Sequence, residues 1–302
     1  MIKINPGNLK EIIAKHVEKV QDYINYDALQ NREKTYVKKN IEYILKAKPE
    51  EFDNIILKIK QNNIDNNRLK KAFVGGSKYG GNIGYAKLSS KGTSTYNAYD
   101  LAKEIRVNVC PYCNRNYTFT IKNKNSKSTR PDFDHFYDKG TYPILALSFY
   151  NLIPSCILCN SRLKSTAKFS INTHLHPYKD SFNDYAKFKF KVIDSRFYYN
   201  EKGFELKLET FGDKRAEKVK EDFALEILYQ EHKDTVLELI QKREIYPDSY
   251  IDELFQQYEG TLFKNREDLL RLITGGYMED KDIDKRPLSK LIKDISEELD
   301  LI

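Results

Sequence analysis

Four cysteines stand in two Cys-x2-Cys pairs, and the 302-residue chain contains no other cysteine. The pairs are Cys110–Cys113 and Cys156–Cys159, with 42 residues between them. Zinc takes four thiolates in a tetrahedron, and a two-residue gap lets one turn supply two of them. We therefore predict one structural zinc ion held by all four cysteines. Four unrelated buried thiols, or one redox-active pair, are the alternatives.

A second group of polar residues lies between the pairs and directly after them. Asp134 and His135 are adjacent, Asn151 follows sixteen residues after the histidine, and Asn160 directly follows Cys159. Carboxylate and amide oxygens are ligands that a hard divalent ion prefers. An imidazole whose pKa lies near neutrality suits a general base acting on water. These residue types suit metal-assisted hydrolysis, in which the ion neutralises charge on the bond that is cut.

Each residue has an expected role and a simpler alternative. We expect Asp134 and Asn160 to hold Mg²⁺ or Mn²⁺. His135 would activate water, and Asn151 would hold the imidazole and fix its tautomer. Taken singly, the Asp-His pair is typical of surfaces or caps, and Asn151 is typical of turns. Asn160 alone is typical of a helix N-cap or of a residue that supports a zinc ligand. Neighbouring side chains point to opposite faces of a strand, so the backbone must bend to bring both Asp134 and His135 to one phosphate. Asp132, in phase with Asp134, is a competing ligand.

The order Asp-His, Asn, Cys-x2-Cys-Asn resembles the HNH, or ββα-metal, endonucleases. Closest in pattern are the members in which two Cys-x2-Cys turns bracket the active site, as in phage resolvases of the endonuclease VII type. The stretch DHFYDKGTYPILALSFYNLIPSCILCNSRLK is similar to bacterial HNH proteins of mobile and defence loci, including those beside retrons and ATPases. The likeness covers residues 107–180, and it departs from many relatives at Asp138, where proline is frequent.

The resemblance implies a zinc-stapled ββα-metal nuclease core and an anti-phage role. It also implies a regulatory ATPase or another defence-system component as partner. A catalytically silent, zinc-stabilised nucleic-acid-binding or adaptor protein is the alternative function. His174 and His176 offer extra metal or phosphate contacts, but we expect them to form a turn with partly exposed imidazoles.

Basic residues surround the motif. Residues 101–170 hold eleven Lys and Arg against four acids, which equals the whole chain's net charge of +7. Such an excess favours a polyanion, and DNA is the expected polymer. Phosphate contacts give affinity without reading sequence, so we expect weak sequence specificity. The predicted contacts are Lys122, Lys124, Lys127, Arg130, Arg162, Lys164 and Lys168, the last two on one helical face. The alternative is that these side chains only keep the domain in solution.

The remaining sequence predicts an α+β, mostly helical fold with helical regions on both sides of the nuclease core. Apolar residues recur at three-to-four spacing over 5–24, 35–47 and 49–61, which predicts three helices. We expect a helical region over 1–72, a Gly/Ser-rich linker or loop over 73–100, the nuclease domain over 101–180, and a β-hairpin plus helices over 181–302. The hairpin turns at Asn200–Gly203, and the helices after residue 213 break near residues 246 and 275.

Composition excludes some classes of protein. Apolar residues make up 40 % of the chain, which is enough for a packed core. No run approaches eighteen apolar residues, and the N-terminus lacks the pattern of a signal peptide. We therefore expect a cytoplasmic protein that does not enter membranes.

Overall fold

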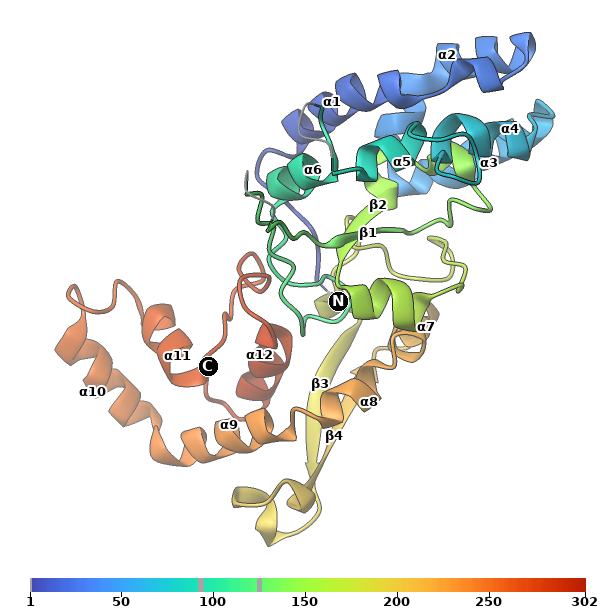
Figure 1. The fold of residues 1–302 in the computed structure, drawn as a ribbon. Helices are drawn as coiled ribbons and strands as arrows, with labels where there is room; N and C mark the ends of the chain where they lie inside the picture. Colours follow the sequence, from blue (N-terminus) through green and yellow to red (C-terminus); the bar gives the residue numbers. More distant parts are fainter. Residues whose placement is uncertain (1, 92–94, 124–126) are drawn as a thin grey trace. The chain divides into compact units, whose positions relative to one another are not determined.

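The computed structural model describes residues 2–91, 95–123 and 127–302. The chain is α+β and about 52 % helical, and its described residues form two small antiparallel sheets of two strands each (Figure 1). The predicted α+β class, with more helix than strand, is confirmed. The contacts divide the chain into two compact units. The predicted division into four regions stays a prediction.

The N-terminal unit comprises residues 4–107 and 118–179. Its helices are α1 (Leu9–Val20), α2 (Asn31–Lys46), α3 (Phe52–Gln61), α4 (Asn66–Leu69), α5 (Gly84–Ser89) and α6 (Ala98–Ile105). The first three occupy the stretches where the apolar period predicts helices. Their inward stripes are buried, as Ile12 and Val20 of α1 and Ile55 of α3 show. These helices supply the core beside which the polar motif lies.

Two strands and one short helix carry the polar motif of the N-terminal unit. Strand β1 (Asp132–His135) pairs antiparallel with β2 (Leu152–Ser155). A short π-helix, η7 (Leu158–Lys164), follows β2. It ends at Lys164, where the next residue, Ser165, has a φ of 43°. Lys168 therefore lies beyond the helix and does not share a helical face with Lys164, contrary to the prediction.

The glycine-rich segment 73–100 contains α5 and the first residues of α6. Gly84, the first residue of α5, has a φ of 54°. A Cβ there would lie 2.3 Å from the carbonyl oxygen of Phe73, so the two backbones touch. A Cβ on Gly75 would lie 2.2 Å from the carbonyl oxygen of Ile83. These glycines permit close backbone packing where the composition suggested a loose linker.

The C-terminal unit comprises residues 1–3, 108–117 and 180–302. The hairpin predicted around Asn200–Gly203 is present as β3 (Ala186–Val192) and β4 (Phe204–Thr210). Phe188 and Leu206 are among its buried apolar side chains. The helices are α7 (Lys214–Asp222), α8 (Leu225–Gln230), α9 (Lys233–Ile245), α10 (Asp248–Tyr258), α11 (Arg266–Thr274) and α12 (Ser289–Glu298).

Helix α12 packs on strand β3 of the C-terminal unit. The carboxylate of Asp294 accepts a hydrogen bond of 2.8 Å from the Phe188 N–H. Lys290, one turn earlier on α12, donates to both oxygens of the same carboxylate, at 3.0 and 2.7 Å. Both side chains of this ion pair are buried, so the pair joins helix to strand without reaching solvent.

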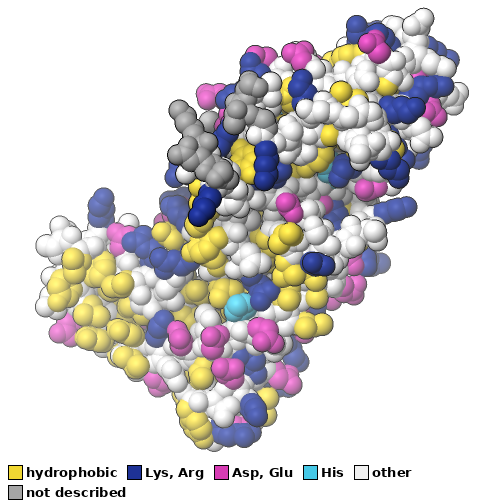
Figure 2. All heavy atoms as spheres, viewed as in Figure 1, with side chains coloured by type: hydrophobic (Ala, Val, Ile, Leu, Met, Phe, Trp, Pro, Cys, Tyr) yellow, Lys and Arg dark blue, Asp and Glu magenta, His cyan; other side chains and the backbone are white. Residues whose placement is uncertain are grey.

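Charged side chains of both signs are mixed over the face of the molecule drawn in Figure 2. Hydrophobic side chains gather there over α10 and α11. None of the helices in the described part of the chain is both long and apolar enough to span a membrane.

Candidate active site

The four cysteines form one buried cluster. Their sulfurs lie within 4.8 Å of one another. Zinc–sulfur bonds of about 2.3 Å in a tetrahedron place sulfurs about 3.8 Å apart, so the donor set fits a metal such as zinc. Each Cys-x2-Cys turn closes with the same backbone hydrogen bond. Asn114 N–H donates to the Cys110 carbonyl at 2.8 Å, and Asn160 N–H donates to the Cys156 carbonyl at 3.0 Å. The predicted cluster is confirmed.

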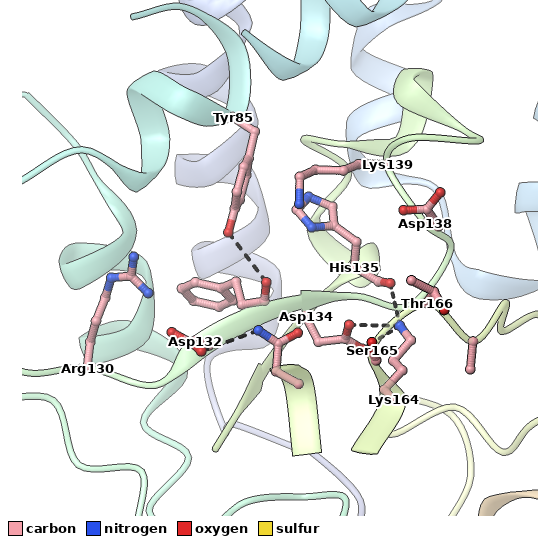
Figure 3. A pocket seen from close by; sticks show the side chains of 13 residues that line it. Tyr85, Arg130, Asp132, Asp134, His135, Asp138, Lys139, Lys164, Ser165 and Thr166 are labelled. Atoms are coloured by element: carbon pink, nitrogen blue, oxygen red, sulfur yellow. Dashed lines mark hydrogen bonds and ion pairs between the residues drawn. The ribbon is translucent and has the colours of Figure 1, made fainter. Parts of the chain in front are cut away.

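One pocket of the N-terminal unit, of about 260 Å³, is lined by Asp134, His135 and Asn160 together. β1 supplies the first two side chains and η7 supplies the third. Further lining side chains are Tyr85, Arg130, Asp132, Asp138, Lys139 and Lys164. Predicted residues from two separate stretches of sequence therefore line one pocket. In Figure 3 the ring of His135 and the carboxylate of Asp134 lie on opposite sides of β1, so the strand keeps its alternation and the expected bend is absent.

His135 is held in one tautomer. Its Nε2 lies 3.0 Å from the carbonyl oxygen of Ala146. A carbonyl only accepts, so we assign the proton to Nε2, which leaves Nδ1 as the basic nitrogen. The edge of the Tyr85 ring packs on the imidazole, with ring centres 4.3 Å apart. Burial lowers the pKa of His135 well below its usual value, and the positive charges of Lys139 and Lys164 lower it further. The imidazole is therefore neutral at pH 7.

Asn151 acts on the loop after β1 and not directly on the imidazole. Its Oδ1 accepts from the Tyr137 N–H at 2.7 Å. Its Nδ2 donates to the carbonyls of Tyr137 and Leu145, both at 3.0 Å. The next carbonyl after Leu145 is the Ala146 carbonyl that receives His135 Nε2. Asn151 is thus a positioning residue: it holds the loop whose Ala146 carbonyl fixes the imidazole.

Replacing Asn151 by alanine is expected to destabilise the protein by about 2–4 kcal/mol, because three buried backbone groups lose their partner. Urea unfolding of the variant and the wild type measures this difference. Asn172→Ala is the matched control, since Asn172 is exposed and makes one side-chain bond to Asp53. Equal unfolding midpoints for the two variants would contradict the role of Asn151 in holding the loop.

Asp134 forms a buried ion pair with Lys164. The Lys164 ammonium lies 2.7 and 2.8 Å from the two carboxylate oxygens, and both side chains are about 95 % buried. The ammonium also donates to the His135 carbonyl at 2.6 Å, and it lies 4.6 Å from the centre of the Phe169 ring. Lys164, predicted to contact phosphate, is instead the internal counter-charge of the predicted metal ligand.

Asp132 and Asn160 face each other in the same pocket. The Asn160 Nδ2 donates to an Asp132 carboxylate oxygen at 3.3 Å, and both residues are partly exposed. The amide oxygen of Asn160 and the carboxylate of Asp132 are hard oxygen donors, the kind that Mg²⁺ takes. Asp132, the competing ligand of the sequence analysis, thus stands nearer to solvent than Asp134 does.

Tyr85 and Lys139 are pocket residues that the motif did not indicate. Burial raises the pKa of Tyr85 to about 12, so its hydroxyl stays protonated and donates to the Phe133 carbonyl at 3.4 Å. Burial also lowers the pKa of Lys139, whose ammonium lies 5.2 Å from the Tyr85 ring centre. Asp138 accepts from the Thr141 N–H and hydroxyl at 2.7 and 2.8 Å, so it caps the turn after β1.

The two histidines that follow the motif are buried, contrary to the expectation of partly exposed imidazoles. His174 stacks on Phe169 with ring centres 3.6 Å apart, and Thr173 lies 2.8 Å from its Nδ1. His176 packs on Phe136, and burial lowers its pKa to about 3. Both rings belong to the aromatic core of the N-terminal unit.

The other predicted phosphate contacts are mostly exposed. Lys122 pairs with Asp100 at 2.7 Å, and Arg130 lines the pocket. Three more lie on the surface, namely Lys127, Arg162 and Lys168. Lys124 falls outside the described residues.

No family model, curated protein or solved structure matches this chain. The likeness to HNH endonucleases stays a prediction from the residues quoted above.

Proposed function

We propose that the chain is a metal-dependent endonuclease of the HNH type that hydrolyses phosphodiester bonds of nucleic acid, with DNA as the first expected polymer. The observation that carries this proposal is the shared pocket of Asp134, His135 and Asn160. The chain order of β1, β2 and η7 supports it as well, since the resemblance implies a strand, strand and helix core.

The geometry of His135 suits a general base. Nε2 is committed to the Ala146 carbonyl, so Nδ1 is the atom that takes a proton from water. The buried imidazole is neutral, so Nδ1 keeps a lone pair that can accept a proton at pH 7. Asn151 supports this arrangement by fixing the loop that carries the carbonyl.

The oxygen donors of the pocket suit a hard divalent ion. Asn160 and Asp134 would hold it, and Asp132 is the second carboxylate within reach of the Asn160 amide. When bound, Mg²⁺ or Mn²⁺ supplies positive charge for the phosphate and the leaving oxygen. Because Lys164 already contacts both oxygens of Asp134, an ion there shares that carboxylate with the ammonium or displaces it.

A catalytically silent nucleic-acid-binding or adaptor protein is the second candidate. The observation that favours it is the same ion pair, since Asp134 is fully engaged without any metal. The anti-phage role and the partner ATPase or other defence component follow from the resemblance and remain proposals. The cytoplasmic location follows from the N-terminal sequence and is also a proposal.

Replacing His135 by alanine is expected to slow cleavage of nucleic acid by about 10²–10⁴-fold, the usual contribution of a general base. Nicking of a supercoiled plasmid in Mg²⁺ or Mn²⁺ measures this effect. His232→Ala is the control, because His232 belongs to the C-terminal unit and bonds to Arg115. Equal nicking by His135→Ala and wild type would exclude His135 as the base. Wild-type protein that binds DNA without cutting it would favour the silent protein.

A further inference from the structure

The segment after residue 117 has its apolar and polar faces reversed. Thr118 is buried, and its hydroxyl donates to the Val107 carbonyl at 2.8 Å. The next alternate side chains, Phe119 and Ile121, are 48 % and 55 % exposed. An extended segment on a core normally turns its apolar side chains inward, because their burial is favourable. Here two large apolar side chains face water instead.

The backbone holds this reversed face in place. Ile121 and Thr129 form an antiparallel bridge with two hydrogen bonds, of 2.8 Å from Ile121 N–H and 3.0 Å from Thr129 N–H. With Thr118 anchored on one side and this bridge on the other, Phe119 and Ile121 cannot turn inward without breaking those bonds. The exposure is therefore built into the fold of the segment.

The charge around this face has one sign. Residues 117–130 contain four Lys and Arg and no Asp or Glu. Among the described residues, Lys127 is exposed, and Lys122 pairs with Asp100 of α6. The last residue, Arg130, lines the pocket that also contains His135. An exposed ring, on an extended segment whose charges are all positive and whose last residue lines the pocket, complements a polyanion that has flat apolar groups.

We propose that residues 118–123 and 127–130 form a binding surface for single-stranded nucleic acid, with a base stacked on Phe119 and phosphates near Lys127 and Arg130. Bases stack on aromatic side chains without regard to sequence, and only unpaired bases expose their faces. Resting on the proposed nuclease function, this inference names the substrate class: a strand with unpaired bases near the bond that is cut.

Binding without cleavage tests the inference. The probes are a fluorescent 20-nucleotide oligothymidylate and a fluorescent 20-base-pair duplex. Their anisotropy is measured in a buffer that contains neither divalent ions nor a chelator. Wild type is expected to bind the single strand more tightly than the duplex. Phe119→Ala is expected to weaken single-strand binding about tenfold with little change for the duplex. Phe119→Trp keeps a stacking face and should restore binding.

Two matched variants separate stacking from charge and from general exposure. Lys127→Ala should weaken both probes to a similar extent, because a phosphate contact does not distinguish them. Phe211→Ala removes an equally exposed ring of the C-terminal unit and should change neither. Thermal unfolding confirms that Phe119→Ala stays folded.

The outcomes are distinct from those of the cleavage test. Tighter duplex binding by wild type, or equal single-strand binding by Phe119→Ala and wild type, would overturn the surface. Absence of nucleic-acid binding would overturn it too, and would favour a protein partner on this face. His135→Ala and wild type could cut equally while Phe119→Ala still weakens single-strand binding. That result would support the binding surface and exclude His135 as the base.

Discussion

Replacing Cys113 by serine is expected to release the zinc and to lower the free energy of unfolding by on the order of 5 kcal/mol. Serine keeps the size of the side chain but does not supply a thiolate, so the ion loses one of four donors. Once the ion is gone, the metal–sulfur bonds that join the two buried Cys-x2-Cys turns are lost. Elemental analysis of protein purified without added metal, followed by thermal unfolding, measures both effects.

Wild type is expected to contain about one zinc ion per chain. Ser161→Ala is the control for substitution next to the second cysteine pair, because Ser161 is exposed and two residues from Cys159. It should keep its zinc and its melting temperature. A Cys113→Ser protein that retains one zinc per chain and melts like wild type would remove Cys113 from the ligand set.

The cysteine cluster was predictable because its signal is local. A two-residue gap fixes how two thiolates can be presented by one turn, and four cysteines without a spare leave one way to combine the turns. The helices α1 to α3 were predictable for a similar reason, since the apolar period is set by helix geometry alone. The β3–β4 hairpin followed from alternation around a turn.

The glycine-rich segment shows that glycine has two uses. The same residues mark flexible loops and places where two backbones touch, and only the folded neighbours decide between them. Gly84 touches the Phe73 carbonyl, which sets α5 and Tyr85 against the pocket. Nothing local to Tyr85 indicates that its ring will pack on His135, fifty residues later in the chain.

The sequence predicted some of the residues that line the pocket, but not which of them contact one another. Asp134, His135 and Asn160, which the motif groups together, all line one pocket. The groups that these side chains contact lie in the loop after β1 and at the C-terminal end of η7. The sequence alone does not indicate those contacts. Ser165 ends the helix one residue after Lys164, and this leaves the lysine directed inward at Asp134.

Replacing Lys164 by methionine is expected to cost about 3–5 kcal/mol of unfolding free energy, because Asp134 becomes a buried charge without its ammonium partner. Methionine keeps an apolar side chain of similar length, and it removes the ammonium together with its ion pair and its 4.6 Å contact with the Phe169 ring centre, so the loss measures the charge. Urea unfolding gives the value. Lys168→Met is the matched control, since Lys168 is exposed and should change stability by less than about 0.5 kcal/mol.

Adding Asp134→Asn to Lys164→Met should recover part of the loss, because the unpaired carboxylate is then removed. The coupling between the two sites is expected to be about 1–3 kcal/mol, as for residues in direct contact.

Mn²⁺ distinguishes the two proposed functions when it is added to the same proteins. If Asp134 takes part in ion binding, Mn²⁺ should raise the melting temperature of Lys164→Met more than that of wild type, since the ion replaces the missing ammonium. Mn²⁺ that stabilises neither protein would argue that Asp134 serves only Lys164 and would favour the silent nucleic-acid-binding protein.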